Sequence, residues 1–163
     1  MEWKQIDGYE NYSVSINGEV RNDKFDRIMK QTLDNKGYYV MNLCKNGKPK
    51  LHLVHRLIAL AFIPLEPGKD FVDHHDGERA NNSVENLRWA TQQENNQNQS
   101  IRKNNKSGFK GVHFENGKWK AQIGIDGKRI HLGYFETIEE AVTVRSARAN
   151  IEFGEFTNSC ERS

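Results

Sequence analysis

Four of the chain's six Asn-Gly or Asp-Gly dipeptides, each flanked by short runs of strand-forming residues, constrain the fold of this chain more than any other feature. They stand at residues 17–18, 46–47, 116–117 and 126–127. Both positions of such a dipeptide accept positive φ readily, so they favour the tight two-residue turns of β-hairpins. The sequence therefore predicts antiparallel hairpins in two stretches, one before residue 54 and one after residue 108.

Helical signals are few and lie between and after these hairpins. The apolar run at 55–62 predicts a short helix that Pro64 ends. Thr91 and Thr137 each begin a capping box, and an alanine-rich helix is expected over 138–153. The predicted fold class is α+β: an N-terminal β-meander, a small strand–strand–helix core, and a C-terminal three-stranded antiparallel sheet packed on one helix.

Composition agrees with several thin cores rather than one large one. Hydrophobic residues make up 36% of the 163 residues, and the mean hydropathy is −0.86. No apolar run approaches the ~20 residues of a membrane span, and the N-terminus has no signal-peptide pattern. Two cysteines without CxxC spacing exclude a disulfide framework, so we expect an intracellular protein. The expected modules are residues 1–52, 53–98 and 108–156, with a linker at 99–107.

The charge is unevenly placed along the chain. The formal net charge is only +2, but residues 96–135 carry eight basic and two acidic side chains. Residues 20–50 are also basic, whereas 136–163 are acidic. A charge run usually marks a solvated face, but basic residues interleaved with aromatic residues on strands favour contact with phosphates.

One constellation has a specific spacing. Asp73-His74 lies on a predicted strand, Asn86 begins an Asn-Leu-Arg-Trp-Ala-Thr block 12 residues after His74, and Asn95 follows 9 residues later on a predicted helix. This order resembles the HNH nuclease family, in particular HNH homing endonucleases with a ββα-metal site, over about residues 53–98. The resemblance implies a metal-dependent DNA endonuclease that hydrolyses phosphodiester bonds.

The resemblance also implies a role for each residue. His74 would be the general base, which suits an imidazole that titrates near neutral pH. Asn86 would orient His74, while Asp73 and Asn95 would bind the metal. One carboxylate and one amide oxygen are hard ligands, so one Mg²⁺ or Mn²⁺ ion per active site is expected rather than Zn²⁺.

Some positions leave alternatives open. His75 stands where the family more often has an apolar residue, and strand alternation would send it to the face opposite His74. Asn81 or Asn82 is an alternative to Asn86 for ordering the loop. His55, at the start of the first predicted helix, fits a phosphate contact or an ordinary helix N-terminus equally well.

The segments that flank the core resemble modules that accompany such nucleases. Residues 1–22 are similar to the N-terminal nuclease-associated motif, and the basic continuation that holds Arg21 and Lys24 is expected to follow the DNA backbone. Residues 107–156 resemble the plant ethylene-response-factor (Apetala-type) DNA-binding domain, whose sheet enters the major groove. The DNA contacts that this resemblance implies are Lys110, His113, Lys118, Trp119, Lys120, Gln122, Arg129 and His131.

Lysine at 110 and histidine at 113 replace the arginine that is common in that domain. Lysine is a point charge, whereas arginine binds guanine through two hydrogen bonds, so we expect looser base specificity.

Double-stranded DNA is the expected partner, with no membrane and no obligate protein partner. One active site per chain predicts a monomer that nicks one strand, or a dimer assembled on DNA, encoded by a virus, phage or mobile element. The competing hypotheses are a non-catalytic DNA-binding protein derived from a nuclease, and a structural RNA-binding protein.

Overall fold

The computed structural model describes residues 2–102 and 104–161, and its contacts divide the chain into two units, Met1–Gln92 and Gln93–Ser163. The helices of these described residues include none that is long and apolar enough to cross a membrane. The strands of the first unit are β1 (Trp3–Ile6), β2 (Tyr9–Ser15), β3 (Val20–Asn22), β4 (Arg27–Ile28), β5 (Thr32–Leu33), β6 (Tyr39–Lys45), β7 (Lys48–Leu53), β8 (Phe71–His74) and β9 (Leu87–Ala90). Its helices are α1 (Val54–Phe62) and the 3₁₀ helix η1 (Val84–Asn86), and α2 (Gln92–Gln97) crosses the division.

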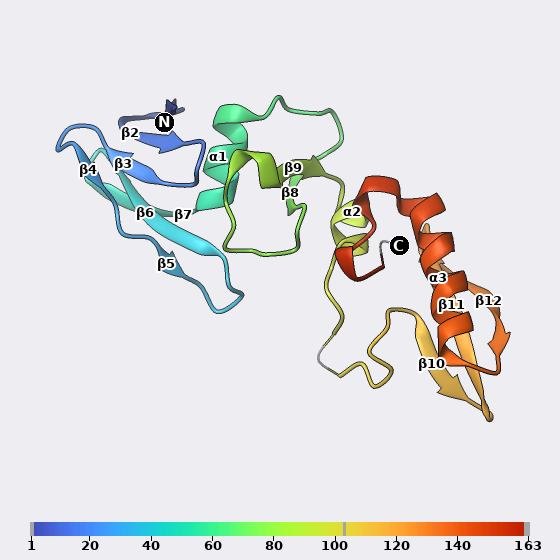
Figure 1. Cartoon of the computed structure of the whole chain (residues 1–163). Coiled ribbons are helices and arrows are strands. Elements are labelled where there is room, and N and C mark those ends of the chain that lie inside the picture. Colours follow the sequence, from blue (N-terminus) through green and yellow to red (C-terminus); the bar gives the residue numbers. More distant parts are fainter. Residues whose placement is uncertain (1, 103, 162–163) are drawn as a thin grey trace. The chain divides into compact units, whose positions relative to one another are not determined.

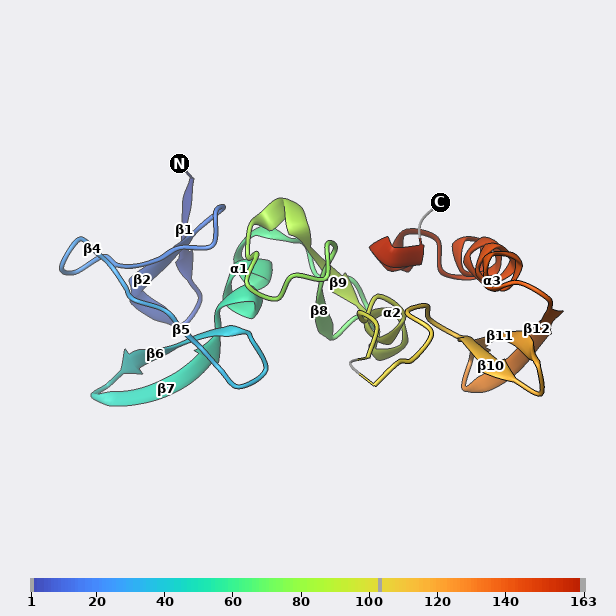
Figure 2. The same cartoon turned by 60° about the horizontal axis from the view of Figure 1, so that its bottom comes forward.

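The first unit contains three small antiparallel sheets. Their strand orders are β1-β2-β3-β4, β5-β6-β7 and β8-β9. Helix α1 packs against strands of all three sheets, as Figure 2 shows. A nine-residue helix with almost no polar residues must be covered on several sides, which explains this central position.

One hydrophobic core runs through this unit. It joins Val14 and Leu43 of the N-terminal strands to Ile58 of α1 and Trp89 of β9, all almost completely buried. Residues on both sides of the expected boundary between 52 and 53 therefore belong to the same core. That this position divides two modules stays a prediction.

The turn dipeptides form hairpins where the sequence predicts them. At 46–47, 116–117 and 126–127 both residues have positive φ, as two-residue turns of the type I′ class require. Residues 17–18 connect β2 to β3, with positive φ at Gly18 alone.

The second unit contains β10 (Val112–Glu115), β11 (Lys118–Ile125), β12 (Lys128–Phe135), α3 (Ile138–Phe153) and the 3₁₀ helices η2 (Gly154–Phe156) and η3 (Ser159–Glu161). The three strands form one antiparallel sheet in sequence order, and α3 covers one of its faces (Figure 1). The predicted helix over 138–153 is confirmed, as is its capping box between Thr137 and Glu140. Ala141, Ala149 and Phe153 are its buried apolar residues.

Two details were not predicted from the sequence. Asn86, the first residue of the Asn-Leu-Arg-Trp-Ala-Thr block, ends the 3₁₀ turn Val84–Asn86, and β9 begins at Leu87. Residues 154–161, for which no structure was predicted, fold back on the unit. There the Thr157 hydroxyl donates to the Ala149 carbonyl at 3.1 Å, and the Asn158 amide donates to the Asn98 carbonyl at 2.5 Å.

Candidate active site and nucleic-acid interface

His74 is the last residue of β8, where it pairs with Leu87 of β9. Its side chain is 4% exposed. Burial lowers the pKa of the imidazole below its usual value, although a hydrogen bond with Asn82 and the nearby Asp73 and Asp76 oppose this. The ring is therefore neutral at physiological pH, which is the protonation state that a general base needs.

Asn82 forms a hydrogen bond with the His74 ring. Its Oδ1 lies 3.1 Å from His74 Nε2, and an amide oxygen can only accept, so Nε2 donates. Asn82 is itself 4% exposed. The turn between β2 and β3 lies against it, because a Cβ on Gly18 would come 3.0 Å from the Cβ of Asn82. The N-terminal strands thus support the residue that holds His74.

Two further rings pack against His74. The His55 ring, from the first turn of α1, meets it edge-on at 5.2 Å between centroids, and the Tyr38 ring lies 6.0 Å away. Tyr38 also contacts His55 at 5.0 Å, and the Arg79 guanidinium stacks over Tyr38 at 5.0 Å. Burial lowers the pKa of His55 to about 4, with the neighbouring His74 and Arg56 adding to the shift. The rings of His55 and Tyr38 restrict the orientations open to the His74 ring.

Asn86 orders the loop that follows His74. Its side-chain amide donates to Asp76 Oδ1 and to the Asn81 carbonyl, both at 2.9 Å, and its Oδ1 accepts from the Asp76 backbone at 3.0 Å. Its own carbonyl accepts from the His75 backbone at 2.8 Å. These bonds position the backbone next to His74. A role for Asn86 in orienting the His74 ring stays a prediction.

Asp73 lies one residue before His74 and is 4% exposed. Arg88, its partner across β8 and β9, binds the Asp73 Oδ2 atom through Nε at 2.9 Å and through NH2 at 2.8 Å. The hydrogen bond from Nε and the ion pair with NH2 fix the position of the Asp73 carboxylate next to His74.

Asn95, the other predicted metal ligand, is half-buried on α2 in the second unit, and His75 is exposed just beyond β8. Within residues 2–102 and 104–161, no group of three or more His, Cys, Asp and Glu side chains is placed to hold a metal ion. The predicted pair has one carboxylate and one amide, a hard oxygen donor set that fits Mg²⁺ or Mn²⁺.

Of the two predicted DNA contacts in the N-terminal sheet, only Lys24 is exposed. Arg21 is half-buried, binds Asp23 at 2.8 Å and stacks over the Trp3 ring at 4.7 Å. Its contacts are those of a residue that stabilises the sheet.

The predicted contacts in the C-terminal sheet lie on both of its faces. His113 pairs with Lys120, and Gln122 pairs with His131, on the face away from α3. Lys118 and Lys120 on that side form ion pairs with Glu136 at 2.6 Å and Glu115 at 2.9 Å.

Three other predicted contacts are placed differently. Trp119 packs on the α3 side with the core cluster of Val112, Ala121 and Ala141, so it does not share a face with His113 and Lys120. Arg129 is exposed, whereas Lys110 is largely buried. Whether these residues contact DNA stays a prediction.

The sequence did not single out several residues that the structure brings to His74. Tyr38 belongs to no motif and lies 36 residues before His74, whereas Arg79 belongs to no motif although it lies only five residues after it. Arg88 stands within the Asn-Leu-Arg-Trp block. Its contact with Asp73 could have been predicted only from the pairing of the two predicted strands, which places Arg88 opposite Asp73.

Two families match the sequence. The family described as HNH endonuclease matches residues 52–97, and the NUMOD4 motif matches residues 1–44. The first match covers β8, η1, β9 and α2, and the second covers the N-terminal strands.

Relatives of the chain occur in a phage and a giant virus. DNA endonuclease I-HmuI of Bacillus phage SP01 is 45% identical over 103 residues, which are 63% of this chain and 59% of that protein. Uncharacterized HNH endonuclease L245 of Acanthamoeba polyphaga mimivirus is 36% identical over 141 residues, which are 86% of this chain and 39% of that protein.

A solved structure, titled DNA binding and cleavage by the HNH homing endonuclease I-HmuI, matches with a TM-score of 0.56 and 46% identity. The match covers 60% of this chain and 57% of that one. The chain thus spans less than two thirds of the length of these relatives. It carries the HNH endonuclease domain and the NUMOD4 motif, and it belongs with the homologues of the HNH homing endonuclease I-HmuI.

Proposed function

We propose that this chain is a metal-dependent endonuclease that hydrolyses phosphodiester bonds in duplex DNA, with His74 as its general base. The observation that carries the proposal is a buried, neutral His74, held by Asn82 next to Asp73, whose carboxylate Arg88 binds, within the HNH domain.

The hydrogen bond with Asn82 selects one tautomer of His74. Because Nε2 donates to the Asn82 oxygen, the lone pair is on Nδ1, and Nδ1 accepts the proton of the attacking water. The surrounding rings of His55 and Tyr38 keep the imidazole in this orientation.

Asp73 and Asn95 are the proposed ligands of one Mg²⁺ or Mn²⁺ ion. The bound ion supplies charge neutralisation at the phosphate and stabilises the leaving oxygen. Arg88 holds the Asp73 carboxylate in place, and Asn86 fixes the loop after His74 through Asp76 and Asn81.

The Apetala-type resemblance of residues 107–156 supports a second part of the proposal, that this unit holds the duplex. Its outward sheet face offers His113, Lys120, Gln122 and His131, and a three-stranded sheet is suited to the major groove. The absence of arginine at 110 and 113 favours contacts with the backbone over contacts with bases.

The test is the conversion of supercoiled plasmid to nicked circles in the presence of Mg²⁺ or Mn²⁺. We expect the wild-type chain to nick one strand, since each chain carries one proposed active site, and chelation of the metal to abolish the reaction. His74→Ala should slow single-turnover nicking about 100-fold or more, because the general base is lost.

The matched control is His75→Ala, which removes the exposed histidine next to the base and should leave nicking close to wild type. Binding of plasmid without nicking, under all metals and targets tried, would instead support the non-catalytic DNA-binding protein.

A further inference from the structure

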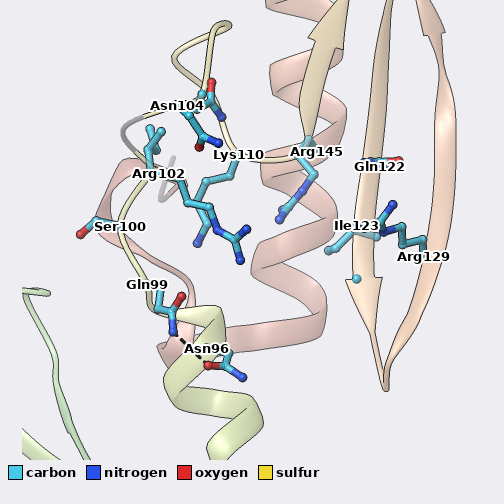
Figure 3. Close-up of a pocket in the computed structure, with 14 residues that line it drawn as sticks. Asn96, Gln99, Ser100, Arg102, Asn104, Lys110, Gln122, Ile123, Arg129 and Arg145 are labelled. Atoms are coloured by element: carbon cyan, nitrogen blue, oxygen red, sulfur yellow. Dashed lines mark hydrogen bonds between the residues drawn. The ribbon is translucent and has the colours of Figure 1, made fainter.

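A basic cavity lies within the second unit. It has a volume of about 410 Å³ and is lined by residues of the segment 96–105, of β11 and β12, and of α3. Its charged lining residues are Arg102, Lys110, Arg129 and Arg145, and no acidic side chain is among the described residues that line it. Figure 3 shows Arg102, Lys110 and Arg145 pointing into the same space from three different segments.

One carboxylate forms ion pairs with two of these cations. Glu161, in the C-terminal η3, binds Arg145 NH1 at 2.7 Å and Lys110 Nζ at 3.1 Å. Lys110 also donates to the Gln97 carbonyl at 2.7 Å. Two positive charges thus share one negative charge in a buried position, and this cluster keeps a net charge of +1 before Arg102 and Arg129 are counted.

Arg145 has an unusual position for an arginine on a helix. It is 6% exposed, and its buried Nε has no hydrogen-bond acceptor among the described residues. Burial lowers the pKa of its guanidinium, and Glu161 opposes this shift. A buried donor without a hydrogen-bond acceptor is unfavourable, so Arg145 has unused capacity to bind an anion.

The backbone makes room for this guanidinium at Gly111. A Cβ at that position would lie 2.7 Å from Arg145 Nε and 2.2 Å from the Gln122 carbonyl oxygen. Gly111 also has a φ of +67°, so both its conformation and its missing side chain allow Arg145 to reach the cavity.

We propose that this cavity binds a backbone phosphate of duplex DNA, with Arg102, Arg129 and Arg145 as its donors and Glu161 as the carboxylate that positions Arg145 and Lys110. The inference rests on the proposed DNA binding of the second unit. Three residues that the sequence marks as DNA contacts, Lys110, Gln122 and Arg129, line this same cavity. Guanidinium groups around a cavity without acidic lining are the arrangement that binds phosphate oxygens.

The alternative is that Lys110, Arg145 and Glu161 only fasten the C-terminal residues to α3. The two explanations differ in what they predict for Arg102 and Arg129, which take no part in the ion pairs with Glu161. A purely structural cluster leaves these two arginines without any specific effect on DNA binding.

The experiment is a salt titration of duplex binding by the full chain, followed by fluorescence anisotropy. Arg102→Gln and Arg129→Gln should each lower the slope of log K against log salt by about one, because each removes a phosphate contact. Lys128→Gln is the matched control: Lys128 is exposed next to Arg129 but does not line the cavity, and its slope should stay at the wild-type value. Equal losses in all three variants, or no loss in either arginine variant, would overturn the proposal.

Glu161→Gln gives a second readout with the opposite sign. Removing the carboxylate raises the net charge of the cluster, so duplex binding should become tighter and its salt slope steeper. Weaker or unchanged binding by a variant that is still folded by circular dichroism contradicts the proposal. If Glu161→Gln does not fold, the arginine variants and their control decide.

Plasmid nicking separates this inference from the proposed endonuclease. Slope changes confined to the cavity arginines support the phosphate site even if no metal or target gives nicking. Nicking that depends on His74, with unchanged slopes for Arg102→Gln and Arg129→Gln, keeps the endonuclease and rejects the cavity. A wild-type chain that does not bind duplex DNA rejects the cavity as well.

Discussion

At the scale of single residues, the His74 ring depends on Asn82, which is buried and supported by the N-terminal turn at Gly18. We expect Asn82→Ala to reduce single-turnover nicking about tenfold or more, because the ring loses the acceptor that fixes its tautomer. Affinity for duplex DNA should not change, since Asn82 is inaccessible. Asn42→Ala, an exposed asparagine on β6, is the control. A parallel loss of DNA affinity would show that Asn82 acts on the fold rather than on the base.

His55 makes the stability of the chain sensitive to acid. Its pKa is about 4 in the folded chain and about 6.5 when unfolded, so the unfolded state binds a proton first as the pH falls. The contribution of neutral His55 to the free energy of unfolding is therefore fully present above pH 6.5. It is lost as the pH falls from 6.5 to 4, by about 3 kcal/mol in total.

Urea unfolding between pH 7.5 and 5 tests this dependence. His55→Gln should show a smaller loss of unfolding free energy across that range than the wild type, whereas His131→Gln, at an exposed position on β12, should follow the wild type. Parallel curves for wild type and His55→Gln would contradict the assignment.

Candidate site residues could be named only where their spacing resembles a known family. The resemblance to the HNH family supplied Asp73, His74, Asn86 and Asn95, and their roles stay predictions. The contact of Tyr38 with His55 and His74 joins positions up to 36 residues apart in the sequence, and no local pattern indicates it.

At the scale of elements, Gly111 decides how the second unit packs. We expect Gly111→Ala to lower the stability of this unit by about 3 kcal/mol or more, because the new methyl group meets the Gln122 backbone as well as Arg145. Gly108→Ala is the matched control, since Gly108 has a φ of +77° but nothing lies within 4 Å of the added Cβ. Both variants share the backbone strain of a non-glycine residue at positive φ, so the difference between their thermal unfolding midpoints reports the steric cost at Gly111. Equal midpoints would contradict a steric role for Gly111.

The elements themselves were largely predictable because their signals are local. Asn-Gly and Asp-Gly turns set three hairpins, and the Thr137 capping box sets the start of α3. The fold-back of residues 154–161 was not predictable, because it depends on a distant carbonyl at Asn98 and on the ion pairs of Glu161.

At the scale of the whole molecule, the HNH residues share their core with the N-terminal strands. A fragment that begins at residue 53 would expose the faces of Leu57 and Ile58 that the N-terminal strands now cover. Burial of each such side chain contributes about 1.5–3 kcal/mol, which is a large part of the stability of a small unit. We therefore expect residues 53–98 alone to be unfolded by circular dichroism, and residues 1–98 to unfold cooperatively in urea. A folded 53–98 fragment would contradict this.

The shared core also bears on how such genes exchange parts. A recombination breakpoint between residues 52 and 53 would divide one hydrophobic core between two parent sequences. The core residues from one parent would then have to pack against residues that evolved in the other. A breakpoint after Gln97, the last residue of α2, leaves that core whole and keeps Asn95 with Asp73. Exchange of segments among these genes should therefore leave the N-terminal strands, β8–β9 and α2 inherited together, while the C-terminal sheet and α3 are free to be replaced.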